Sequence, residues 1–158
     1  MTKDGHLVTS HDPCLKATTN ILDYAAEYAD RVGTWSFEPA YDNDCTDDYL
    51  IREFTLEELK GLRRRQRYST RNTDLDDLFQ IMTFEEVIEQ MQGLYQSHPK
   101  TRPWKIGLYV ETKMYQFYLD NYGENIAQMT YDVLKKYGLE TIDKCKDTMP
   151  IIIECFEG

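Results

Sequence analysis

Apolar residues recur every three or four positions in two stretches near the middle of the chain, which is the period of an amphipathic helix. The first stretch, residues 55–66, begins with a capping box formed by Thr55 and Glu58. Its apolar face consists of Leu56, Leu59 and Leu62. The second stretch begins with the same pattern at residues 83–86 and ends near Gly93. Its apolar stripe consists of Phe84, Val87, Ile88 and Met91. The pattern therefore predicts two helices.

Three shorter stretches have the composition of β-strands. Residues 6–11 follow an Asp4-Gly5 turn and are stopped by Pro13. Residues 106–113 alternate apolar and polar side chains, which is the period of a strand. Residues 149–156 contain a continuous isoleucine run, typical of a strand that is buried on both faces in a parallel sheet.

Residues 114–137 are predicted to form two further helices separated at Gly123, with Gly138 as a C-cap. Residues 13–53 lack clean periodicity, and we expect a long loop or insertion there with one helical turn near residues 22–30. Elsewhere strands and helices alternate, as in βαβ units. The predicted fold class is therefore α/β, with about three strands and three to four helices.

Composition narrows the class of protein. The chain has 158 residues, of which 41% are hydrophobic and 13% aromatic, which excludes a disordered chain. The formal net charge of -10 argues against a protein that binds nucleic acid through a basic surface. We predict no membrane span, because no run of about 18 apolar residues occurs, and the first residues do not resemble a signal peptide. The four cysteines form no C-x-x-C pair, so a zinc site has little support and disulfide pairing stays open.

Two charged stretches have competing interpretations. The carboxylates within residues 42–48 could bind calcium, but their spacing does not fit an EF-hand loop, and we favour a solvated loop. The arginines at residues 63–65, together with Arg67, could form a patch for phosphate or for an acidic partner. We favour the alternative in which these cations stabilise the carboxyl end of the preceding helix.

Two pairs of polar residues lie at the ends of predicted strands. His11 and Asp12 end the first strand, a usual position for active-site groups, and a histidine can exchange a proton near neutral pH. Taken alone, such a pair is more often a hydrogen bond that orders a loop. Glu111 and Lys113 end the second strand, and their spacing points both side chains to one face. They could bind a metal ion and an anionic substrate, or form a simple ion pair at a barrel rim.

Taken together, these stretches resemble the glycerophosphodiester phosphodiesterases, in particular the plant-like eukaryotic branch of that family. The family has a T-K-D-G turn and a strand ending in H-D-P, which correspond to residues 2–5 and 11–13. A T-T-N stretch follows at residues 18–20, an F-T-L-E-E-L-K-x-L-R helix at residues 54–63 and an I-x-T-F-E-E segment at residues 81–86. The strand G-[IL]-Y-x-E-x-K matches residues 107–113, and the final isoleucine-rich strand with Phe156 resembles the family's next barrel strand.

The resemblance implies a fold, a reaction and a set of site residues. The fold would be part of a TIM (β/α)8 barrel, with residues 1–158 as an incomplete catalytic domain and residues 13–53 as its loop or insertion. His11 would be one of two catalytic histidines, Glu111 one ligand of a divalent cation (Ca2+ or Mg2+), and Lys113 a ligand of the substrate phosphate. The reaction would hydrolyse a small-molecule glycerophosphodiester to sn-glycerol 3-phosphate and an alcohol, in lipid and glycerol metabolism.

Three motifs that are typical of the family do not occur in the 158 residues. They are an H-R-G motif with the other catalytic histidine, a P-E-N-T segment and an E-x-D pair with two more metal ligands; His6 and His98 lie in other contexts. We therefore expect a shortened family member that has little or no phosphodiesterase activity alone. The alternative is a non-catalytic binding or structural subunit, whose open barrel edge a protein partner or an oligomer covers. The family leans towards secretory or vacuolar proteins, and the compartment stays open.

Overall fold

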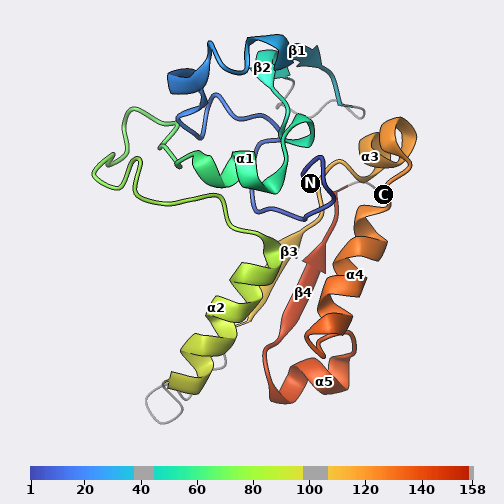
Figure 1. Cartoon of the computed structure of the whole chain (residues 1–158). Coiled ribbons are helices and arrows are strands. Elements are labelled where there is room, and N and C mark those ends of the chain that lie inside the picture. The colour runs from blue at the N-terminus through green and yellow to red at the C-terminus, as the bar shows by residue number, and fades with distance from the viewer. Residues whose placement is uncertain (38–44, 98–106, 157–158) are drawn as a thin grey trace. The chain divides into compact units, whose positions relative to one another are not determined.

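The computed structural model describes residues 1–37, 45–97 and 107–156, which divide into two units (Figure 1). The first unit is Met1–Thr83, and the second is Phe84–Gly158. Each unit has its own elements and is described by itself.

Outside residues 38–44, which are not described, the first unit combines short 3-10 helices, a two-stranded antiparallel sheet and one α-helix. The elements are η1 (Ile21–Tyr24), η2 (Ala29–Arg31), β1 (Val32–Trp35), β2 (Cys45–Tyr49), η3 (Ile51–Glu53) and α1 (Leu56–Gly61). Phe54 lies fully buried at the centre, where its ring meets those of Tyr28 at 5.1 Å and Tyr49 at 6.3 Å. The surrounding core consists of Leu15, Ile21, Ile51, Leu59, Leu62 and Ile81.

Residues 13–53 are more structured than the pattern predicted. The expected helical turn is present as η1, but the two strands β1 and β2 were missed. Their pairing has a bulge between Gly33 and Trp35, β1 has only four residues, and β2 carries consecutive aspartates and shows no simple alternation. Of the carboxylates within residues 42–48, those at 42–44 lie outside the described residues.

The strand predicted over residues 6–11 is wrong, although the turn before it is confirmed. Gly5 has a φ of 86°, and its N–H donates to the Thr2 carbonyl at 3.2 Å. After the turn, Val8 forms a single isolated bridge with Thr83. The pairing cannot extend past Thr83, because the partner segment enters helix α2 (Phe84–Ser97) at the next residue.

Helix α1 confirms the predicted capping box and corrects the predicted end. The Thr55 hydroxyl accepts from the Glu58 N–H, and the Glu58 carboxylate accepts from the Thr55 N–H. The helix ends at Gly61, because Leu62 adopts an extended backbone and turns its side chain into the core. The arginines that follow therefore leave the helix.

Over its described residues, the second unit has one parallel pair of strands and four helices (Figure 1). After α2 come β3 (Leu108–Glu111), α3 (Tyr115–Tyr122), α4 (Ile126–Lys136), α5 (Ile142–Asp147) and β4 (Ile151–Glu154). The strands pair in register from Leu108 with Ile151 to Glu111 with Glu154. The parallel pairing and the helix break at Gly123, which has a φ of 68°, confirm two predictions.

Three details of the second unit differ from prediction. Helix α2 continues to Ser97, past Gly93, and the short helix α5 was missed. Ile152 and Ile153 of β4 are 57% and 47% exposed, so the expectation of burial on both faces is wrong here. Ile106 lies outside the described residues. A strand joined to a parallel neighbour by helices is the unit of a TIM barrel; the partial barrel itself stays a prediction.

Candidate functional site

The segment that carries His11 is held against the end of its own unit. The Thr9 N–H donates to the Met82 carbonyl at 2.8 Å, next to the bridge between Val8 and Thr83. Two residues further on, the His11 side chain is 58% exposed, whereas Asp12 after it is buried. His11 therefore combines a fixed backbone with access to solvent.

Asp12 is the immediate partner of His11. Its carboxylate oxygen Oδ1 lies 2.7 Å from His11 Nδ1. Burial would raise the pKa of Asp12, but hydrogen bonds from His11 and Arg67 outweigh it, so the pKa lies below its usual range. An ionised carboxylate can only accept a hydrogen bond, so Nδ1 carries the hydrogen in this contact. In a neutral imidazole, Nε2 is then the basic nitrogen.

Arg67 completes this cluster from 55 residues further along the chain. Its Nη1 lies 2.8 Å from Asp12 Oδ1 and 2.7 Å from Oδ2. Its Nη2 donates to the Tyr68 hydroxyl at 2.7 Å, and the guanidinium stacks on the Tyr68 ring. The sequence pattern did not predict this contact. Arg67 lies close to three other arginines, and nothing in the sequence distinguishes it from them as the partner of Asp12.

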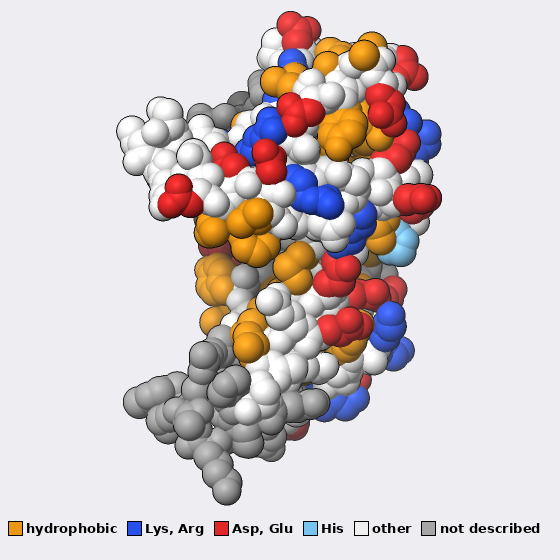
Figure 2. Space-filling view, turned by 60° about the vertical axis from the view of Figure 1, so that its left-hand side comes forward, with side chains coloured by type: hydrophobic (Ala, Val, Ile, Leu, Met, Phe, Trp, Pro, Cys, Tyr) orange, Lys and Arg blue, Asp and Glu red, His pale blue; other side chains and the backbone are white. Residues whose placement is uncertain are grey.

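The other arginines of this stretch have separate partners. Arg63 donates to the carbonyls of Lys60, Gly61 and Leu62, which confirms the helix-end interpretation for this residue. Arg65 instead bridges Asp23 and Asp77. Lys and Arg side chains are interspersed with Asp and Glu on the face shown in Figure 2. The arginine run is therefore satisfied internally and does not form one basic patch.

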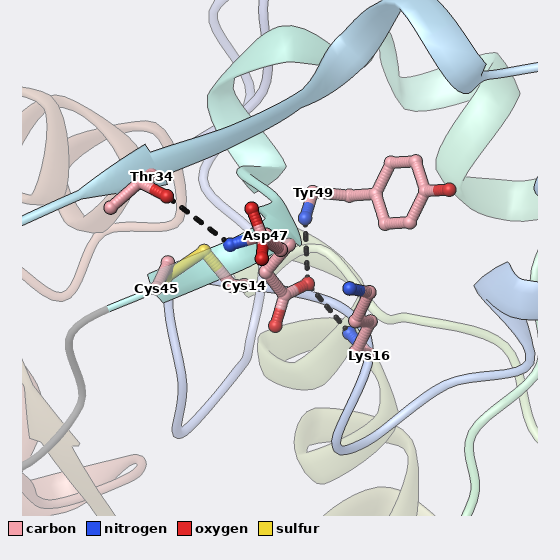
Figure 3. The surroundings of a disulfide bond; sticks show 7 residues. Cys14, Lys16, Thr34, Cys45, Asp47 and Tyr49 are labelled. Carbon is pink, nitrogen blue, oxygen red and sulfur yellow. Dashed lines mark hydrogen bonds between the residues drawn. A yellow bond between two sulfur atoms is a disulfide. The ribbon is translucent and has the colours of Figure 1, made fainter.

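A disulfide joins Cys14, two residues after Asp12, to Cys45 at the start of β2 (Figure 3). Nearby, the Asp48 carboxylate accepts from the backbone N–H groups of Lys16 at 3.0 Å and Tyr49 at 2.6 Å. The Asp47 N–H donates to the Thr34 hydroxyl, as Figure 3 also shows. Asp48 thus orders this region through its carboxylate, which argues against a calcium role for that side chain.

Glu111 and Lys113 flank a residue that is anchored to the neighbouring strand. Thr112 is buried, and its N–H donates to the Glu154 carbonyl at 2.9 Å. Lys113 Nζ lies 3.4 Å from Glu111 Oε1, and both side chains are about one-quarter exposed. Met114 then adopts a left-handed backbone, with a φ of 57°, and starts α3. The two side chains therefore form an ion pair at the carboxyl end of β3.

The sequence analysis did not single out Glu154, which ends β4 in register with Glu111. Its carboxylate accepts a hydrogen bond from Tyr109, and this bond raises the Tyr109 pKa. The position of Glu154 near Glu111 could have been predicted from the sequence, because neighbouring parallel strands bring their carboxyl ends to one sheet edge.

The described residues do not make a metal site by themselves. Nowhere in residues 1–37, 45–97 and 107–156 do three or more His, Cys, Asp or Glu side chains gather in a way that could hold an ion. His11 belongs to the first unit, and Glu111 and Lys113 belong to the second. Likewise, none of the described helices is long and apolar enough to cross a membrane. His98 lies outside the described residues.

Comparison with known proteins identifies the same family by a family pattern and by individual relatives. The Glycerophosphoryl diester phosphodiesterase family pattern matches residues 1–158. The chain is 32% identical over 168 residues to a glycerophosphodiester phosphodiesterase of Haemophilus influenzae, covering 99% of this chain and 40% of that protein. It is also 32% identical over 160 residues to a glycerophosphodiester phosphodiesterase of Arabidopsis thaliana, covering 98% and 40% respectively. The chain thus spans about 40% of the length of these relatives. It belongs to the glycerophosphoryl diester phosphodiesterase family.

Proposed function

We propose that this chain supplies part of an active site that hydrolyses glycerophosphodiesters to sn-glycerol 3-phosphate and an alcohol. Family membership supports the class of reaction. The observation that carries the proposal is the contact between His11 Nδ1 and the Asp12 carboxylate at 2.7 Å. Histidines oriented in this way are common proton-transfer groups in hydrolases.

In the proposed reaction, His11 exchanges a proton with the attacking or the leaving oxygen. The hydrogen bond from Nδ1 to Asp12 leaves Nε2 as the nitrogen that can take or return that proton. The exposure of the ring gives a substrate access to Nε2. Asp12 stabilises the imidazolium that forms when Nε2 takes the proton.

The proposed roles of Glu111 and Lys113 follow from their chemistry at the end of β3. The Lys113 ammonium is suited to a phosphate oxygen, and its pairing with Glu111 limits the directions in which it points. We assign Glu111 as one oxygen ligand of a divalent cation, because Ca2+ and Mg2+ prefer carboxylate ligands. The remaining ligands of such an ion would come from outside the described residues.

A second candidate function is that of a non-catalytic binding or structural subunit. The observation that favours it is the exposure of apolar side chains on the parallel strands, with Tyr109 at 65% and Ile152 at 57%. Large exposed apolar side chains on a two-stranded sheet are typical of a surface that another segment or protein covers.

The experiment that tests the enzyme proposal is a chimera in which this chain replaces the matching segment of the Haemophilus influenzae relative. Hydrolysis of glycerophosphocholine is measured at increasing Ca2+. We expect Lys113→Met to raise KM by about tenfold or more, because a charged hydrogen bond to phosphate is lost, and Glu111→Gln to raise the Ca2+ concentration needed for half-maximal rate.

Lys136→Met and Glu85→Gln are the controls, since Lys136 and Glu85 form a more exposed ion pair at 2.9 Å elsewhere in the second unit. Equal effects at both ion pairs would contradict the assigned roles. An active chimera would argue against the purely structural alternative. The 158 residues alone are expected to show little or no turnover, and turnover that His11→Ala abolishes would contradict this expectation.

A further inference from the structure

Two arginines of one short segment hold the stretch of backbone that carries His11. We call residues 63–67 the arginine segment. Arg64 reaches back to the Thr9 carbonyl, and its Nη1 lies 3.4 Å from the Ser10 hydroxyl. Arg67 contacts both oxygens of Asp12. The arginine segment therefore contacts residues on both sides of His11.

Asp12 connects Arg67 to His11 through one shared atom. Oδ1 accepts from His11 Nδ1 at 2.7 Å and from Arg67 Nη1 at 2.8 Å, while Oδ2 accepts from Arg67 at 2.7 Å. The Asp12 side chain is only 11% exposed, so its charge has little contact with water. A buried carboxylate needs a cation or several hydrogen bonds, and Arg67 supplies the cation.

We propose that Arg67 is a positioning residue for His11. It balances the charge of Asp12 and fixes the carboxylate plane, so that Asp12 orients a neutral His11 through Nδ1 and leaves Nε2 basic. The effect of Arg67 on catalysis rests on the proposed function, whereas the effect of Arg67 on the orientation of His11 does not. Within the first unit, the charged groups at this cluster are His11, Asp12 and Arg67, with Arg64 acting on Asp12 from further away.

The charge balance matters because His11 is the other cation available to Asp12. Without Arg67, the buried carboxylate would be neutralised by a protonated His11, and an imidazolium cannot accept a proton. With Arg67 in place, Asp12 already has a cation partner, and a neutral imidazole can fill the contact at Nδ1. Arg67 therefore favours the neutral form of His11, which is the form that can serve as a base.

The test is an NMR titration of the histidine ring protons of the 158-residue chain, with His6→Gln and His11→Gln used for assignment. We expect Arg67→Met to move the titration midpoint of His11 to higher pH, by on the order of one pH unit. Asp12→Asn should move it in the opposite direction. Arg67→Lys, which keeps the charge, should return it towards that of the unchanged chain.

Arg71→Met is the matched control, because Arg71 stacks on the same Tyr68 ring at 4.6 Å, as Arg67 does. In the part of the chain that the structure describes, the Asp12 carboxylate accepts hydrogen bonds from His11 and Arg67, and Arg71 is not among its partners. We expect Arg71→Met to leave the His11 midpoint in place. Equal midpoints in Arg67→Met and in the unchanged chain would overturn the proposal.

A second readout needs no variant that removes Arg67. Ring 15N shifts of the unchanged chain, recorded above the midpoint, should show His11 with its hydrogen on Nδ1, and a hydrogen on Nε2 would also overturn the proposal. Both measurements are independent of turnover. A failure of the phosphodiesterase proposal is therefore distinguishable from a failure of the positioning role.

Discussion

Glu58 connects the start of helix α1 to the rest of the first unit. Its carboxylate accepts from Arg31 at 2.7 and 2.9 Å and from the Thr55 N–H at 2.8 Å. Hydrogen bonds from Arg31 are the main cause that lowers the pKa of Glu58 from 4.5 to about 2. Because the folded state holds the carboxylate ionised more strongly than the unfolded state does, this stabilisation is complete above about pH 4.5 and is lost as pH falls towards 2.

Glu58→Gln should therefore lower the free energy of unfolding by about 1 kcal/mol at neutral pH, since the partly buried ion pair with Arg31 is lost while the glutamine can still accept from the Thr55 N–H. Urea denaturation at pH 7 and pH 3 measures this. The difference between the two proteins should be smaller at pH 3. Glu57→Gln is the matched control, because it removes a charge from the same helix turn at an exposed position. A difference that grows at pH 3 would contradict the assignment.

The sequence predicted His11 better than it predicted the surroundings of His11. Asp12 was visible as a neighbour in the chain, and its contact with His11 is local. Arg67 was not, because its role depends on how a segment 55 residues away folds back. The roles of His11, Glu111 and Lys113 came from the family resemblance and stay predictions.

Elements with strong local signals were predicted well. The capping box of α1 and the break at Gly123 both depend on residues within one turn, and both are present. Strands β1 and β2 were missed because they are short and depend on their mutual pairing. The strand at residues 6–11 was predicted from composition, yet only Val8 finds a bridging partner. Local signals thus sufficed for helices, whereas strands required tertiary context.

The start of the β3–β4 pair depends on the absence of a side chain at Gly107. A Cβ placed there would lie 2.4 Å from the Pro150 carbonyl oxygen. The same oxygen accepts the first hydrogen bond of the pair, from the Leu108 N–H at 2.9 Å. Any other residue would push the two strands apart at this point.

We expect Gly107→Ala to lower the free energy of unfolding by about 1–3 kcal/mol and to speed hydrogen exchange of the Leu108 amide. Gly93→Ala serves as the control, because it lies within α2 with no atom near the added methyl group. That change should raise stability by about 0.5–1 kcal/mol. Unchanged exchange at Leu108 in Gly107→Ala would contradict the proposed clash.

The disulfide between Cys14 and Cys45 links residues 31 positions apart and closes a loop that includes η1, η2 and β1. Replacing both cysteines by serine should lower the free energy of unfolding by about 3–4 kcal/mol, because the unfolded chain gains freedom. Thermal unfolding measures this, with Cys155→Ser at an exposed position as control. An equal melting temperature for the double variant and the unchanged chain would show that the bond contributes nothing. Disulfides persist in oxidising compartments, and the compartment of this protein stays a prediction.

The family to which the whole chain belongs is established, whereas its function is a proposal. Residues 1–158 match the family pattern, yet they span about 40% of the length of the relatives compared. The 158 residues contain one of the two histidine motifs that the resemblance implies. Our central claim is that this segment contributes His11 as a proton-transfer group to a phosphodiesterase site.

The most direct measurement is the rate of glycerophosphocholine hydrolysis by the chimera with the Haemophilus influenzae relative, with and without His11→Ala. His6→Ala is the control, since His6 is a half-exposed histidine of the same unit. We predict that the chimera is active, that His11→Ala lowers kcat by about 10²–10⁴-fold, as expected for loss of a general acid or base, and that His6→Ala leaves kcat unchanged. Full activity in the His11→Ala chimera would contradict the account.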